Sequence, residues 1–139
     1  AKYVGIGGAS YGAQIAIYTV AREPGRFGRL LIESPSVYSD NYQLLKIVHS
    51  METTPGRISI GLGTNEDGLA ACAPGHPPED EMKDTLRLRD VLVETSHRLA
   101  VILLNVTECG RHTASAFGAR FPTAVEFLYG GTIVTTQGR

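Results

Sequence analysis

The chain has 139 residues, of which 42% are hydrophobic, and its formal net charge is -1. This length and apolar content predict one domain with a substantial core, and the near-neutral charge predicts no polyanion partner such as a nucleic acid. No run approaches the roughly 18 consecutive apolar residues of a membrane helix, and no basic region with an apolar core marks a signal peptide. We expect a soluble protein, with the cytoplasm slightly favoured.

The first predicted unit is a strand, a glycine-rich turn and a helix. The apolar stretch at residues 3–7 predicts the strand, and the pentapeptide GASYG follows at residues 8–12. Beyond the turn, small and apolar residues recur at helical spacing, and the Glu-Pro-Gly sequence at residues 23–25 ends the helix. The recurring residues are Ala13, Ala16, Ile17 and Val20.

Three further strand and helix pairs are predicted along the chain. Residues 29–33 and 57–62 are short apolar runs, and residues 100–106 form an unbroken apolar run typical of a strand buried on both faces. A helix is predicted over about 40–50, and a last one over about 113–129, interrupted at Pro122 and ended by glycines 130–131. Between these lies an amphipathic helix that carries Leu88, Val91, Leu92, Thr95 and Leu99.

The alternation of strands and helices predicts an α/β fold with a parallel sheet of about four strands and flanking helices. We assign residues 1–131 to a partial domain and residues 132–139 to a loose C-terminal tail. The loop over residues 64–78 is long enough to suggest a functional role. The two cysteines, Cys72 and Cys109, are too few for a disulfide framework or a metal site, so we expect two buried or free thiols.

The GASYG pentapeptide fits the G-x-S-x-G pattern of a nucleophile elbow, in which a serine lies on a strained turn between a strand and a helix. Glycines are expected on both sides of Ser10 because a Cβ there would clash. The rival interpretation is a dinucleotide-binding turn, since residues 5–10 nearly match G-x-G-x-x-G. That pattern has Ser10 in place of its third glycine, and Glu33 is somewhat late for the expected ribose-binding acid.

A serine nucleophile needs a base and an acid that orients the base. Ser10 follows the first predicted strand, Glu66 and Asp67 follow the third, and His112 follows the fourth. The carboxyl ends of parallel strands meet at one edge of a sheet, so these side chains are expected to converge there. Glu66 and Asp67 are adjacent and cannot both face His112, so either one remains the candidate acid. The remaining histidines, His49, His76 and His97, do not follow the last strand.

These residues resemble an esterase family of α/β hydrolases that includes enterochelin esterases, S-formylglutathione hydrolases, feruloyl esterases and mycolyltransferases. The likeness covers nearly all of the chain. It comprises GASYG with its helix, PGRFG at residues 24–28 leading to IESPS at 32–36, GTNE at 63–66, GRH at 110–112, and the aromatic residues at 121–129. The family often has an aromatic residue, frequently Trp, soon after the histidine, whereas this chain has no Trp.

The resemblance implies the C-terminal part of an α/β-hydrolase fold and ester hydrolysis through an acyl-enzyme. Ser10 would be the nucleophile, His112 the base and Glu66 the acid, with one oxyanion bond from the Tyr11 N–H and no metal or cofactor. The substrate would be a small ester. Alternatives are an acyltransferase of the same family and a non-catalytic remnant or subunit that acts by binding. Only about seven residues precede the elbow, so a missing N-terminal segment or a homo-oligomer would be needed to complete the sheet.

Overall fold

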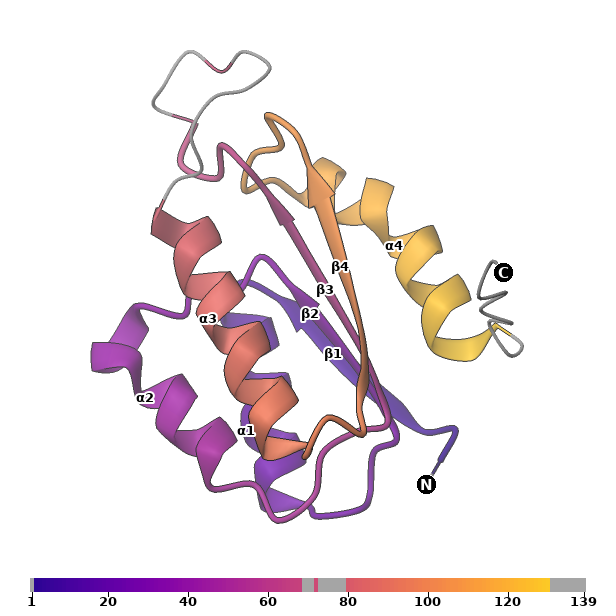
Figure 1. The fold of residues 1–139 in the computed structure, drawn as a ribbon. Coiled ribbons are helices and arrows are strands. Elements are labelled where there is room, and N and C mark those ends of the chain that lie inside the picture. The colour runs from indigo at the N-terminus through magenta and orange to yellow at the C-terminus, as the bar shows by residue number, and fades with distance from the viewer. Residues whose placement is uncertain (1, 69–71, 73–79, 131–139) are drawn as a thin grey trace, which may run out of the picture.

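The computed structural model describes residues 2–68, 72 and 80–130. Its strands and helices alternate along the chain (Figure 1). They are β1 (Gly5–Ala9), α1 (Tyr11–Arg22), β2 (Arg29–Glu33), α2 (Ser39–His49), β3 (Arg57–Gly63), α3 (Asp80–Thr95), β4 (Val101–Thr107) and α4 (Ala114–Tyr129). The four strands form one parallel sheet in the order β1-β2-β3-β4, which confirms the predicted fold class. The predicted tail at 132–139 lies outside the described residues.

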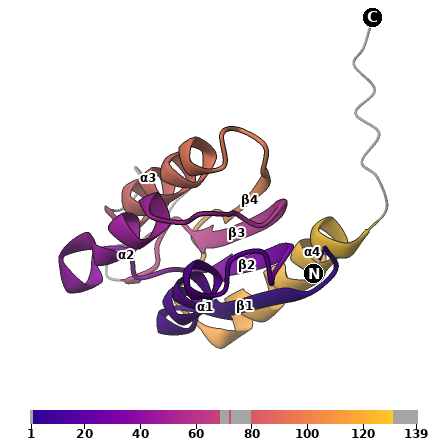
Figure 2. The ribbon, with the colours of Figure 1, turned by 90° about the horizontal axis from the view of Figure 1, so that it is seen from below.

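Helices cover both faces of the sheet. Helices α1, α2 and α3 lie on one side and α4 lies on the other (Figures 1 and 2). The main core lies between the sheet and the first three helices. Its inner residues are fully buried and come from α1, from the two central strands and from α3: Ile17, Leu30, Ile32, Ile58, Ile60, Leu88 and Leu92. Burial of one such side chain contributes about 1.5–3 kcal/mol, so this layer holds the strand ends in fixed positions.

Strand β4 differs from its prediction. Its unbroken apolar sequence indicated burial on both faces, but Val101 is 55% exposed and Val106 is 37% exposed. The reason is its place in the sheet, because among the strands that the structure describes β4 pairs with β3 alone and forms one edge. Strand β1 forms the other edge of this sheet.

Two helix predictions also need correction. Helix α4 continues through Pro122 without interruption. Its start is capped, since the Thr113 hydroxyl accepts a hydrogen bond from the Ala116 N–H at 3.2 Å. Helix α3 ends at Thr95, so Leu99 lies beyond it and is 81% exposed. Leu99 matched the helical spacing but takes no part in the buried face.

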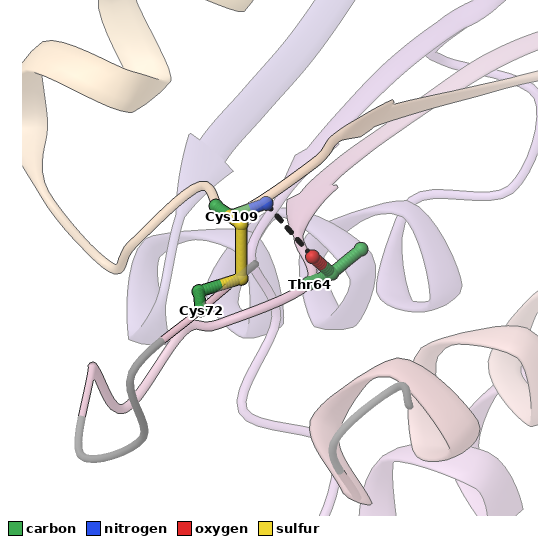
Figure 3. The surroundings of a disulfide bond; sticks show 3 residues. All are labelled: Thr64, Cys72 and Cys109. Atoms are coloured by element: carbon green, nitrogen blue, oxygen red, sulfur yellow. Dashed lines mark hydrogen bonds between the residues drawn. A yellow bond between two sulfur atoms is a disulfide. The ribbon is translucent and has the colours of Figure 1, made fainter. Parts of the chain in front are cut away.

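The two cysteines form a disulfide, contrary to the expectation of free thiols. Cys72 lies after β3 and Cys109 lies directly after β4, with their Cα atoms 5.6 Å apart (Figure 3). The Cys109 N–H also donates a hydrogen bond to the Thr64 hydroxyl at 2.9 Å. The disulfide therefore joins the two loops that carry Glu66 and His112. Within the described part of the chain, no helix is long and apolar enough to cross a membrane.

Candidate active site

Ser10 lies on a strained turn between β1 and α1. Its φ is 55°, in the left-handed region that costs a residue with a Cβ, and such strain is concentrated at functional sites. The Ser10 N–H donates to the Glu33 carbonyl oxygen at 2.9 Å, which ties the turn to the end of β2. A Cβ on Gly8 would lie 2.4 Å from the carbonyl carbon of Gly12, so the sharp turn requires glycine there.

The steric argument fails at the second glycine of the motif. A Cβ on Gly12, in the first turn of α1, would meet no atom within 4 Å. Only Gly8 is therefore sterically required in the elbow. The Tyr11 N–H, at the first residue of α1, is one of the N–H groups that a helix leaves without an intrahelical partner. Such a group favours negative charge nearby, as an oxyanion donor must.

Glu66 and His112 are in direct contact. The Glu66 Oε2 atom lies 2.8 Å from the His112 Nδ1 atom, and the His112 backbone N–H donates to the Glu66 carbonyl oxygen at 3.0 Å. The glutamate side chain is only 5% exposed, whereas that of the histidine is 39% exposed. A carboxylate acceptor favours the tautomer with the proton on Nδ1 and leaves Nε2 free as a base. Asp67 is exposed at the mouth of the same pocket.

Ser10, Tyr11, Glu66, Asp67 and His112 line one cavity of about 270 Å³. The remaining lining residues come mainly from the loop after β2 and from α3: Ser34, Pro35, Ser36, Tyr38, Leu62, Glu81 and Thr85. Ser10 and His112 face this shared cavity, although their side chains make no direct hydrogen bond. The predicted site residues are therefore gathered at the carboxyl ends of the strands, as parallel topology requires.

Backbone contacts hold the two loops of the site together. The Thr64 N–H donates to the Thr107 carbonyl at 3.1 Å, and the Asn65 N–H donates to the Gly110 carbonyl at 3.1 Å. A Cβ on Gly63 would overlap the Gly110 backbone, so the loops meet without space between them. Together with the disulfide, these contacts fix the separation of Glu66 and His112.

A buried polar network behind Glu66 was missed from the sequence. Its members are Glu33, Ser34 and Arg120, all less than 6% exposed. The Ser34 hydroxyl donates to Glu66 Oε1 at 2.9 Å, and the Arg120 Nε–H donates to Glu33 Oε1 at 2.6 Å. Burial raises the pKa of Glu33 above its usual value, and the Arg120 guanidinium opposes that rise. The sequence signal was the polar pair Glu33-Ser34 at the end of an apolar strand.

The aromatic residue near the histidine is Phe117. Its ring packs edge-on against the His112 ring, with centroids 5.1 Å apart and planes at 88°. Phe117 comes five residues after the histidine, on the first turn of α4, and supplies ring packing without a Trp.

The other histidines lie outside this cluster. His49 is exposed at the last residue of α2, His97 is exposed beyond the end of α3, and His76 lies outside the described residues. Among the residues that the structure describes, no group of three or more His, Cys, Asp or Glu side chains could hold a metal ion.

Comparison with known proteins identifies the fold. No protein-family model and no curated protein matches the sequence. Solved structures do match. The siderophore hydrolase EstB from Aspergillus nidulans has a TM-score of 0.68 at 16% identity, over 88% of this chain and 48% of that one. The BES protein from Bacillus cereus has a TM-score of 0.63 at 14% identity, over 89% and 44%.

A similar fold also occurs within a longer chain. Dipeptidyl peptidase 4 from Porphyromonas gingivalis has a TM-score of 0.63 at 16% identity, over 95% of this chain and 20% of that one. The chain thus spans about half the length of the first two structures and a smaller part of the third. The parallel sheet and these matches together show that the chain has the α/β-hydrolase fold.

Proposed function

We propose that the chain carries the catalytic residues of a serine hydrolase that cleaves carboxylic esters through an acyl-enzyme. The observation that carries this proposal is the hydrogen bond between Glu66 Oε2 and His112 Nδ1, at 2.8 Å, in a cavity that Ser10 also lines. A buried carboxylate, a half-exposed imidazole and a serine on a strained turn are the three groups that acyl transfer through serine requires.

Each residue has one task in the proposed mechanism. The Ser10 Oγ attacks the ester carbonyl while His112 Nε2 takes its proton, and the Tyr11 N–H donates to the oxyanion. The bond from the acyl carbon to the alcohol oxygen then breaks, and the alcohol leaves with the proton from His112. Water attacks the acyl-enzyme by the same steps and releases the free acid. Throughout, Glu66 holds the imidazole in one tautomer and stabilises its charged form.

Labelling with a fluorophosphonate probe tests the nucleophile. The full chain is incubated with the probe, and the modified peptide is identified by mass spectrometry. We expect the adduct on Ser10, lost in Ser10→Ala. Ser36→Ala is the matched control, because Ser36 lines the same cavity and should leave labelling unchanged. If Ser10→Ala still labels like the unmodified chain, or if the unmodified chain does not label, the proposal is wrong.

Product analysis tests the reaction. A small aryl ester in water should release both its alcohol and its free acid, and neither should form with Ser10→Ala. If the acid appears only as a new ester with an added alcohol, the protein is an acyltransferase of the same mechanism rather than a hydrolase.

A further inference from the structure

Arg120 is a buried side chain close to the candidate acid Glu66, and each of its guanidinium nitrogens donates a hydrogen bond. It is 3% exposed. Its Nε–H donates to Glu33 Oε1 at 2.6 Å, one terminal nitrogen donates to the Thr107 hydroxyl at 3.1 Å, and the other donates to the Ser34 hydroxyl at 3.2 Å. The guanidinium therefore has partners from β2, from β4 and from the loop after β2. A rigid planar fork with three anchors cannot rotate freely.

The contact with Ser34 determines which way the serine hydroxyl points. A hydroxyl has one hydrogen to donate, and an arginine can only donate. Because Arg120 occupies a lone pair of the Ser34 oxygen, the single hydroxyl hydrogen is directed to Glu66 Oε1, 2.9 Å away. The Gly63 N–H donates to the same carboxylate oxygen. Glu66 Oε1 is thus held by two donors, and Oε2 is left to accept from His112.

Charge supports the same arrangement. An Arg120 terminal nitrogen lies 4.0 Å from Glu66 Oε1 and 2.5 Å from Glu33 Oε1, so one cation lies close to two buried carboxyl groups. Breaking such a buried set by removing one member leaves an uncompensated charge. Gly61 leaves room for the Glu33 carboxyl group, since a Cβ at position 61 would lie 2.2 Å from Glu33 Oε2.

We infer that Arg120 is a positioning residue for the acid of the site: anchored by Glu33, it orients the Ser34 hydroxyl toward Glu66 and so fixes the carboxylate that orients His112. This inference rests on the proposed function, but its structural content can be measured without activity. Arg120 is not among the residues that line the cavity, and it reaches the site through Ser34 and Glu66. Its guanidinium also lies over the ring of Phe117, 6.0 Å from the ring centroid.

Proton NMR of the full chain reads the arrangement directly, through the signal of the His112 Nδ1 proton hydrogen-bonded to Glu66. We expect this signal in the unmodified chain and its loss in Arg120→Met, which keeps the length of the side chain but not its donors. The matched control is Arg57→Met. Arg57 also ties α4, by donating to the carbonyls of Phe127 and Gly130, but it does so at the other end of the helix. Arg57→Met should lower stability and keep the signal.

Folding of each variant is checked by circular dichroism. If Arg120→Met does not fold, Arg120→Lys carries the measurement, because it keeps the buried charge without the fork, and the same loss is expected. A folded Arg120 variant that keeps the His112 signal overturns the inference. In Ser34→Ala we also expect the signal to be lost, and in the Ser34→Ala/Arg120→Met double variant no further change, since the two residues act in series.

Probe kinetics adds a functional measurement. Arg120→Met should slow fluorophosphonate labelling of Ser10 by about tenfold to a hundredfold, because small displacements of catalytic groups reduce reaction rates by factors of this size. The two proposals fail differently. Absent labelling of the unmodified chain refutes the proposed function and leaves the NMR result to decide the role of Arg120. Normal labelling of Arg120→Met, with the His112 signal intact, refutes the role of Arg120 alone.

Discussion

Removal of the disulfide should cost the protein a large share of its stability. Cys72 and Cys109 are separated by 37 residues, and cross-linking residues so far apart restricts the unfolded chain. For a loop of this length, the chain-entropy relation gives a loss of about 13 cal/mol/K, or about 4 kcal/mol at 25 °C. We therefore expect the Cys72→Ser/Cys109→Ser variant to have a free energy of unfolding lower than that of the unmodified chain by about 3–4 kcal/mol.

Urea unfolding followed by circular dichroism measures this difference. A change of this size corresponds to a fall in Tm of about 10 °C or more for a chain of this length. Reductant added to the unmodified chain should reproduce the loss, whereas reductant added to the double variant should have no effect. A double variant within about 1 kcal/mol of the unmodified chain would refute the reasoning, since the unfolded chain would then gain little freedom.

Three further outcomes follow from the site. In urea titrations, Gly8→Ala should lower the free energy of unfolding by at least about 2 kcal/mol, because the new Cβ would meet the backbone of Gly12. Gly12→Ala should raise it by up to about 1 kcal/mol, because the new Cβ has open space and alanine favours a helix more than glycine does. Equal effects of the two substitutions would contradict the elbow geometry. Glu66→Gln should slow probe labelling by about 10⁴-fold, because the amide no longer fixes the histidine tautomer. Asp67→Asn should leave labelling nearly unchanged, and the reverse order would make Asp67 the acid. The pKa of Glu33 is raised in the folded chain, so the folded chain binds this proton more tightly than the unfolded chain does. The free energy of unfolding of the unmodified chain, relative to that of Glu33→Gln, should therefore decline as the pH rises above 4.5. An increase of this difference with pH would contradict the direction of the pKa shift.

The fold could be predicted almost completely from local patterns. The apolar runs at 29–33 and 57–62 match β2 and β3 closely, and the helical spacing of Ala13, Ile17 and Val20 matches α1. The errors lie where tertiary position overrides local pattern. The run at 100–106 has the composition of a central strand, but neighbours decide exposure, and β4 has only one. Pro122 is compatible with the middle of α4, although proline usually ends a helix.

The site was only partly accessible from the sequence. The G-x-S-x-G motif and the order of Ser10, the acid and His112 along the chain place these residues after predicted strands. Because the carboxyl ends of parallel strands lie at one edge of the sheet, the three residues are then expected to meet there. The choice between Glu66 and Asp67 depends on which side chain of a loop turns inward, and no period in a loop sequence reports that. The Arg120 contacts with Glu33 and Ser34 span 87 and 86 residues, so no local pattern could reveal them.

The pairing of the two cysteines could not be predicted from the sequence. Two cysteines carry no information about pairing, because the distance between their Cα atoms depends on the folded paths of two loops. In the structure both loops leave the same end of adjacent strands, which brings Cys72 and Cys109 together. Such bonds persist in oxidising compartments and are rare in the cytosol.

The residues of the candidate site are far apart in the sequence, so the site can form only when the chain folds. Ser10 follows β1, Glu66 follows β3, His112 follows β4, and Arg120 belongs to α4, so bringing them together requires strand pairings between distant parts of the sequence. Parallel pairings of this kind form slowly, after helices have had time to form. A partly folded chain with its helices in place but its strands unpaired would therefore lack the site. If the proposed function holds, probe labelling during refolding would report when these four strands have paired.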